Sequence, residues 1–258
     1  MSEKLQLDEP AEGVARLTIS NPERRGALDH EILDALAGHA RTLAARCLVI
    51  RGSGEMFSAG YDIGNLSEQE FEESAEQLVA HPFHEALEAL EAYRYPVIAE
   101  VNGHAIGGGL ELALTADIRI AASGVKMGMP PAKLGLIYSH TGLAKFIDVC
   151  GPANTAELFF VGRTVEARRA LEMGLVNAVV DPKALEERVL DLAAEIASNA
   201  PLSLAGNKRM IRTLRALRLP EDLERELIEL RESCFASEDF REGVRAFTEK
   251  RKPVWRGR

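Results

Sequence analysis

Short apolar runs alternate with stretches of helical periodicity over the first two thirds of the chain. Residues 14–20 are rich in β-formers and end at an Asn-Pro pair, which predicts a strand and a turn. From residue 29 to 46 apolar positions recur at helical spacing, with Asp29 as the expected N-cap. Three further runs resemble strands buried on both faces: residues 47–50, 96–99 and 117–121. This alternation predicts an α/β architecture.

The pattern changes near residue 182 and is helical from there to about residue 252. Pro201 and Pro220 stand where first-turn prolines would open new helices. Along residues 221–236 the apolar positions recur at helical spacing: Leu223, Leu227, Leu230 and Cys234. We therefore expect a core over residues 1–182. A helical C-terminal region over 183–258 should pack on that core, on a neighbouring subunit, or on both.

Composition and net charge limit the kinds of partner that we expect the protein to bind. Among 258 residues, 40 acidic side chains against 31 basic ones give a net charge of −9, which offers no strong field to nucleic acid or to an anionic membrane. No apolar run is long enough to span a bilayer, and the polar N-terminus does not resemble a signal peptide. We expect a cytoplasmic protein with no nucleic-acid or membrane partner. Small anionic ligands remain allowed.

Cysteine and histidine give no metal signal. Cys47, Cys150 and Cys234 are far apart, and they form no CxxC pair. The six histidines are scattered without a ligand pair. We expect reduced, buried or half-buried thiols and no metal site.

Two glycine-containing segments suggest chemistry. Residues 56–63 follow the 47–50 strand, and small residues at 58–60 would let another group approach the backbone; the alternative is a plain strand-to-helix loop. Residues 107–109 are three glycines before a helical stretch, and a helix N-terminus exposes N–H groups to an anion. The spacing is not GxGxxG, so a dinucleotide fold is not indicated. Glu111 falls in or near the first turn of this predicted helix. There it could either stabilise the helix dipole or supply a carboxylate beside an oxyanion site.

A third segment, residues 128–142, brackets an apolar patch with prolines, glycines and polar side chains. Tyr138 and His140 are candidates for a pocket there. Taken singly, each residue fits a packed or surface side chain better than a pocket residue.

Together these segments resemble the crotonase superfamily, the enoyl-CoA hydratase/isomerase family. Five stretches carry the resemblance in the family's order: residues 21–28, 57–63, 103–117, 163–179 and 238–251. The resemblance implies an α/β fold, a spiral of ββα units forming two roughly perpendicular sheets. It also implies a helical C-terminal oligomerisation region, and assembly as a homotrimer or a dimer of trimers. Residues 1–182 would be the crotonase-like catalytic core.

The resemblance also implies a site. The thioester carbonyl of an acyl-CoA would lie between the backbone N–H groups of Tyr61 and Gly108, which would stabilise an enolate as charge grows on the oxygen. No cofactor is implied, because CoA is part of the substrate. The positions expected to contact CoA are Arg24 or Arg25, Ala27, Ala59, Asp62, Ile63 and, at the C-terminal end, Phe247 and Lys250.

The sequence departs from the family at one catalytic position. Hydratases of the family use two glutamates; the first matches Glu111, but the second falls on Pro131, which cannot transfer a proton. The third segment is similar to the methylmalonyl-CoA decarboxylase branch, which also lacks the second glutamate and has a tyrosine matching Tyr138. That branch carries histidine where this chain has Tyr61, so the match is partial.

Three interpretations follow. The first is a hydratase or isomerase type of acyl-CoA enzyme with Glu111 as its single acid/base. The second is an acyl-CoA decarboxylase in which Tyr138 or His140 shapes the pocket or donates the proton. The third is a CoA- or RNA-binding scaffold without catalysis. The acidic charge counts against RNA, and the intact 107–111 segment counts against a lost active site.

Overall fold

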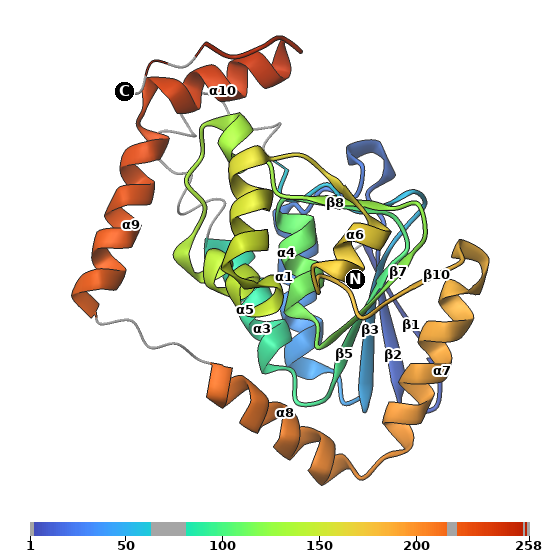
Figure 1. Cartoon of the computed structure of the whole chain (residues 1–258). Helices are drawn as coiled ribbons and strands as arrows, with labels where there is room; N and C mark the ends of the chain where they lie inside the picture. The colour runs from blue at the N-terminus through green and yellow to red at the C-terminus, as the bar shows by residue number, and fades with distance from the viewer. Residues whose placement is uncertain (1–2, 63–80, 216–220, 255, 257–258) are drawn as a thin grey trace.

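The structure, a computed structural model, describes residues 3–62, 81–215, 221–254 and 256. Two sheets form its centre (Figure 1). The large sheet has the strand order β1 (Leu5–Ala11), β2 (Val14–Ile19), β3 (Cys47–Gly52), β5 (Val97–Val101), β7 (Ile118–Ala122) and β10 (Ala178–Val180). The small sheet has the order β4 (Met56–Ser58), β6 (His104–Ile106), β8 (Lys126–Gly128) and β9 (Val165–Glu166).

A repeated ββα unit builds both sheets. The units end in the helices α3 (His81–Ala92), α4 (Gly108–Thr115) and α5 (His140–Ala156), and α1 (His30–Thr42) follows the first hairpin. In each unit the first strand joins the large sheet and the second joins the small one, always parallel to its counterpart in the next unit. Parallel neighbours need such crossover connections. The predicted spiral of ββα units is confirmed.

The predicted elements lie where the patterns put them. The Asp29 carboxylate accepts the Ile32 N–H at 3.0 Å and so caps α1 as expected. The runs at residues 47–50, 96–99 and 117–121 are β3, β5 and β7 of the large sheet. By contrast, α3, α5 and the short strands of the small sheet had no counterpart among the predicted elements.

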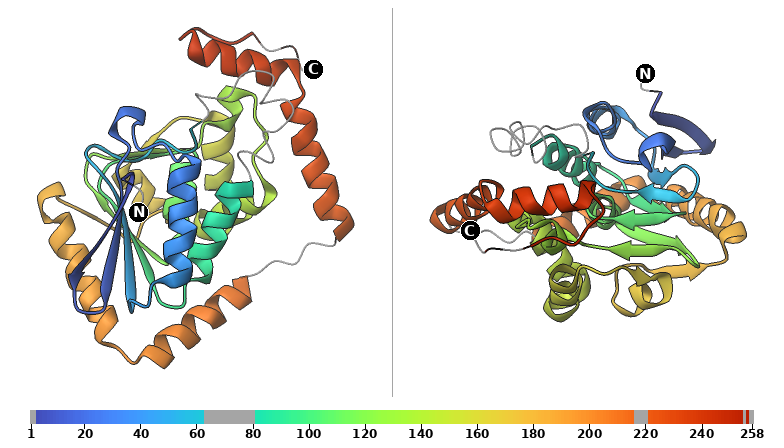
Figure 2. Two further views of the ribbon diagram at one scale, coloured as in Figure 1. Left: turned by 180° about the vertical axis from the view of Figure 1, so that it is seen from behind. Right: turned by 90° about the horizontal axis from the view of Figure 1, so that it is seen from above.

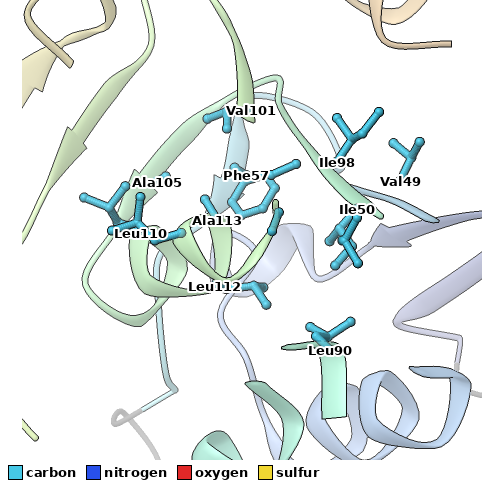
Figure 3. Packing of buried hydrophobic residues seen from close by; sticks show 14 of the residues in the cluster. Val49, Ile50, Phe57, Leu90, Ile98, Val101, Ala105, Leu110, Leu112 and Ala113 are labelled. Atoms are coloured by element: carbon cyan, nitrogen blue, oxygen red, sulfur yellow. The ribbon is translucent and has the colours of Figure 1, made fainter. Parts of the chain in front are cut away.

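Apolar side chains from both sheets meet around α4. Figure 3 shows Phe57 of β4 among Val101, Ala105 and Ala113. The α4 helix packs against α3, α5, β4, β5 and β6, and every residue from Gly109 to Thr115 is buried. This packing buries Glu111 along with its apolar neighbours.

The C-terminal region is helical, as predicted. It comprises α7 (Leu185–Ser198), α8 (Pro201–Arg215), α9 (Glu221–Phe235) and α10 (Glu238–Thr248). Pro201 opens α8 as expected. Pro220 lies outside the described residues, as do the side chains of Leu223, Leu227, Leu230 and Cys234.

These helices relate to the core in different ways. α7 packs across β1, β2, β3, β5 and β7, whereas α8 and α9 run along the outside of the molecule (Figures 1 and 2). α10 returns to the core at the 3-10 turn η3 (Pro131–Leu134), where a side-chain carbon on Gly243 would lie 2.2 Å from the Leu134 carbonyl oxygen. The C-terminal region therefore packs on the core of its own chain. The division at residue 182 stays a prediction. Within the described part of the chain, no helix has both the length and the apolar character needed to cross a membrane.

Candidate functional site

Two glycine-containing segments meet backbone to backbone at the start of α4. Gly60 has φ +91°, and a side-chain carbon there would lie 2.9 Å from the backbone nitrogen of Gly108. A side-chain carbon on Gly109 would lie 2.3 Å from the Ser58 carbonyl oxygen. The segment that follows β4 and the N-terminus of α4 come into contact because Gly60 and Gly109 have no side chain. The close approach expected at residues 58–60 is confirmed.

Hydrogen bonds hold the segment around Tyr61 in place. The Leu28 N–H donates to the Gly60 carbonyl at 2.8 Å, and the Asp62 N–H donates to the Leu28 carbonyl at 3.1 Å. The Ser58 hydroxyl donates to the Gly26 carbonyl at 2.8 Å and accepts the Gly60 N–H at 3.1 Å. The backbone of residues 58–62 is thus fixed from the segment that precedes α1.

The first turn of α4 presents N–H groups on the same side. The N–H groups of Leu110 and Glu111 bond to the Gly107 carbonyl, whereas those of Gly108 and Gly109 donate to no other described residue. A side-chain carbon on Gly108 would lie 3.5 Å from the Tyr61 backbone nitrogen and 3.2 Å from the Phe83 ring. The positive end of the α4 dipole therefore lies beside Tyr61, under the ring of Phe83.

Glu111 is the carboxylate of this site. It lies in the first turn of α4, and only 5% of its surface is exposed. The Tyr138 hydroxyl donates a hydrogen bond to Glu111 Oε2. Lys145 Nζ lies 3.7 Å from Glu111 Oε1. The structure therefore brings Glu111 and Tyr138 together, as two of the predicted site residues.

Tyr138 remains a hydroxyl over a wide pH range. Burial, the neighbouring Glu111 charge and the hydrogen bond to Glu111 raise the pKa of Tyr138 well above 10. Its ring also packs edge-on against Phe159, with 5.5 Å between centroids. Tyr138 is thus a fixed hydrogen-bond donor to the Glu111 carboxylate.

Tyr61 has a polar neighbour of its own. Its hydroxyl lies 3.2 Å from His30 Nε2, and the two rings meet edge-on. Burial, reinforced by Asp62 and Asp29, raises the pKa of Tyr61 to about 12. The side chain is therefore neutral at physiological pH.

Pro131 opens the turn η3 and is buried. It carries no titratable group at the position where the family pattern expects the second glutamate. His140 begins α5 just after the cap Ser139, which accepts the Gly142 N–H at 3.1 Å.

Five of the positions expected to contact CoA lie together beside Tyr61. Arg24 Nη1 lies 3.6 Å from Asp62 Oδ1, and the Arg25 carbonyl accepts the Ala59 N–H at 3.2 Å. Ala27 follows in the same segment, and its carbonyl accepts the Asn21 amide at 2.8 Å. These residues thus belong to two segments that are hydrogen-bonded to each other next to the start of α4.

Three other positions were expected to contact CoA. Ile63 lies outside the described residues. Phe247 is 67% exposed near the end of α10. Lys250 is exposed just beyond α10, and no hydrogen bond or ion pair among the described residues links it to the Tyr61 segment. In the ranges that the structure describes, no cluster of three or more His, Cys, Asp or Glu side chains is suited to a metal ion.

The sequence reasoning missed three residues of the site. Phe83 and Glu91 belong to α3, and Lys145 belongs to α5, two helices that were not among the predicted elements. Lys145 stands between Ala144 and Phe146, and an isolated lysine in an apolar stretch has no pattern that announces its partner. Only the packing of α3 and α5 on α4 brings these residues to Glu111.

Comparison with known proteins agrees with this geometry. The family model for enoyl-CoA hydratase/isomerase matches residues 9–258. A probable enoyl-CoA hydratase from Bacillus subtilis (strain 168) is 36% identical over 249 residues, 95% of each chain. A carnitinyl-CoA dehydratase from Escherichia coli O157:H7 is 33% identical over 266 aligned positions, covering 100% of both chains.

A solved structure shares the architecture even more fully. Methylmalonyl-CoA decarboxylase in complex with 2-nitronate-propionyl-CoA matches with a TM-score of 0.92 at 28% identity, covering 100% of both chains. The match extends over the two sheets and the C-terminal helices alike. The chain therefore belongs to the enoyl-CoA hydratase/isomerase family of the crotonase superfamily.

Proposed function

We propose that this protein is an enzyme acting on an acyl-CoA thioester through an enolate, as a lyase or isomerase of the hydratase/isomerase type. The thioester oxygen would accept hydrogen bonds from the backbone N–H groups of Tyr61 and Gly108. Preorganised donors of this kind favour the developing oxyanion over the ground state, and each is typically worth about 2.7–4 kcal/mol of barrier. Glu111 would move the proton at the adjacent carbon.

One observation carries the proposal: a buried carboxylate stands in the first turn of the helix whose N-terminus meets the Tyr61 backbone. Glu111 is 5% exposed, and a side-chain carbon on Gly108 would lie 3.5 Å from the Tyr61 backbone nitrogen. An enolate needs a base beside the α-carbon and a positive field at the oxygen. Both features come from one turn of α4.

A single carboxylate limits the reaction. Hydration requires groups that handle both the water and the α-proton, and the second family position is Pro131. An isomerase needs one group that takes a proton from one carbon and returns it to another. The site therefore favours proton transfer at the thioester over hydration of a double bond.

Decarboxylation is the second candidate, favoured by Tyr138. In this reaction the bond between the α-carbon and the substrate carboxylate breaks, the electron pair remains as the enolate, and CO₂ leaves. A proton then adds to the α-carbon. The hydrogen bond from Tyr138 to Glu111 and the TM-score of 0.92 to methylmalonyl-CoA decarboxylase support this alternative.

The substrate side of the proposal includes CoA contacts. Ala59, Asp62 and Ile63 would lie near the adenine end of CoA. Arg24 or Arg25 and Ala27 would line the way to it, where a basic side chain suits a phosphate. Lys250 would contribute from the C-terminal segment. The similarity to an enoyl-CoA hydratase, a carnitinyl-CoA dehydratase and methylmalonyl-CoA decarboxylase supports a CoA thioester as the substrate class.

A panel of acyl-CoA thioesters, followed by mass spectrometry in D₂O, tests the proposal. We expect α-deuterium to enter a saturated acyl-CoA, because enolate formation is reversible whatever the net reaction. Crotonyl-CoA hydration should be slow. Release of CO₂ from methylmalonyl-CoA or ethylmalonyl-CoA would select the second candidate. No exchange and no turnover on any thioester would contradict the proposal, and brisk crotonyl-CoA hydration would refute the argument from Pro131.

A further inference from the structure

Behind Glu111, away from Tyr138, lies a lysine that the proposed chemistry has not yet used. Lys145 of α5 points its ammonium group into the space between α3 and α4, and its side chain is 12% exposed. Its Nζ lies 3.7 Å from Glu111 Oε1, 2.9 Å from Thr115 Oγ1 and 2.7 Å from Glu91 Oε1. One cation thus stands between the buried carboxylate of α4 and a carboxylate of α3.

The two oxygens of Glu111 have different partners. Oε2 accepts the hydrogen bond from Tyr138, while Oε1 faces Lys145 at ion-pair distance. Thr115, one turn further along α4, donates its hydroxyl to the Glu111 carbonyl and accepts from Lys145. Lys145 is thereby fixed relative to α4.

We propose that Lys145 is a positioning residue that holds the Glu111 carboxylate in place through Oε1, and that Glu91 in turn fixes Lys145. This inference rests on the proposed role of Glu111 as the acid/base. A carboxylate that is almost wholly buried needs a hydrogen-bond or ion-pair partner at each oxygen, and Lys145 supplies the partner at Oε1. Glu91, with a 35% exposed side chain, contacts the same ammonium group at 2.7 Å and so limits where it can move.

Few other charged groups face this cluster. α3 contributes Glu91, α5 contributes Lys145, and the segment before α5 contributes Tyr138. β4 has no titratable side chain. On β6 the His104 ring accepts the Lys126 N–H, and on β5 Glu100 pairs with Arg51. Lys145 is therefore the cation that the described residues set against Glu111.

The test combines steady-state kinetics on an acyl-CoA with crystal structures of the ligand-free enzyme. In Lys145→Met, kcat should fall about 10–100-fold while KM changes little, because a displaced acid/base slows the reaction without weakening binding. In Glu91→Gln the fall should be smaller. The Glu111 carboxylate should also leave its parent position in Lys145→Met. A residue that served packing alone would not lower kcat selectively.

Two further variants make the result decisive. Lys145→Arg keeps the charge and should retain most of the parent kcat and the parent position of the Glu111 carboxylate. Lys126→Met removes a lysine that pairs with Glu166 at the edge of the small sheet, and it should leave both unchanged. If Lys145→Met does not fold, Glu91→Gln decides, because Glu91 is partly exposed.

An unchanged kcat together with an unmoved Glu111 carboxylate in Lys145→Met would overturn the inference. The ligand-free structures need no substrate, so they stand apart from the proposed function. Absence of turnover on every acyl-CoA with a displaced Glu111 carboxylate in Lys145→Met would remove the function and keep the role of Lys145. Turnover in the parent with an unmoved carboxylate and undiminished kcat in Lys145→Met would do the reverse.

Discussion

Among the residues that the structure describes, two glutamates are almost wholly buried, and their polar partners differ. Glu111 has a donor or a cation at each oxygen, supplied by Tyr138 and Lys145. Glu100 of β5 is 1% exposed and pairs with Arg51 at 3.3 Å, but its Oε2 has no hydrogen-bond partner among the described residues. Burial raises the pKa of Glu100 above its ordinary value. A buried carboxylate with a partner at both oxygens is compatible with a catalytic role. A buried carboxylate with one unpartnered oxygen lowers the stability of the folded protein.

Replacing Glu100 should therefore stabilise the protein in a pH-dependent way. Because the pKa of Glu100 is raised in the folded protein, the free energy of unfolding falls as the pH rises and Glu100 ionises. The free energy of unfolding of Glu100→Gln should exceed that of the parent by about 1 kcal/mol at pH 8. The difference should shrink toward pH 4.5, as measured by denaturant unfolding across this range.

Glu186 provides a control of opposite sign. Its hydrogen bond to Arg16 lowers the pKa of Glu186, so its contribution to stability is present above the unfolded pKa and is lost as the pH falls. Glu186→Gln should be the less stable variant at pH 8 and approach the parent in acid. If Glu100→Gln is destabilised to the same degree at every pH, the account of Glu100 is wrong.

At the scale of secondary-structure elements, the site depends on how closely the segment that follows β4 approaches α4. Gly60 has φ +91° and leaves no room for a side chain beside the Gly108 nitrogen. The contact sets the distance between the two backbone N–H groups proposed to bind the thioester oxygen. Catalysis is sensitive to displacements of about 1 Å in such groups.

Gly60→Ala should accordingly lower turnover on an acyl-CoA by about 100-fold. Gly54→Ala is the matched control, because Gly54 also has a positive φ of +65° but has open space where a side chain would go. Both variants should lose about 1–2 kcal/mol of stability from the strained backbone. Equal turnover of the two variants would show that the approach of Gly60 to Gly108 does not matter to the reaction.

At the scale of the whole molecule, sequence patterns predicted one sheet far better than the other. β3 and β5 of the large sheet are apolar runs long enough to be read directly, but the strands of the small sheet have two or three residues each. Glu111 and the glycines of α4 share one segment and were found together. Phe83 and Glu91 come from α3 and Lys145 comes from α5, and only tertiary packing brings these two helices to α4. A local pattern cannot encode that juxtaposition.

The C-terminal helices lead to a prediction about assembly. α8 is anchored to the core by buried Lys208, whose Nζ lies 2.8 Å from Asp117 Oδ2. Along the same helix, Leu202 and Leu214 are 79% and 83% exposed. We expect the protein to cover such side chains by forming a homotrimer or a dimer of trimers, seen by light scattering as three or six times 28.2 kDa. A monomer mass at every concentration would contradict this expectation.

Glu111 is the residue on which the account depends most, and replacing it gives the most direct test. Glu111→Gln keeps the size of the side chain and its ability to accept from Tyr138, but it cannot take up a proton as a base. Turnover, or α-deuterium exchange into an acyl-CoA, should fall at least about 100-fold while thermal unfolding stays close to that of the parent. Glu166→Gln, on the exposed edge strand β9, should leave both unchanged. Undiminished exchange in a folded Glu111→Gln protein would contradict the central claim.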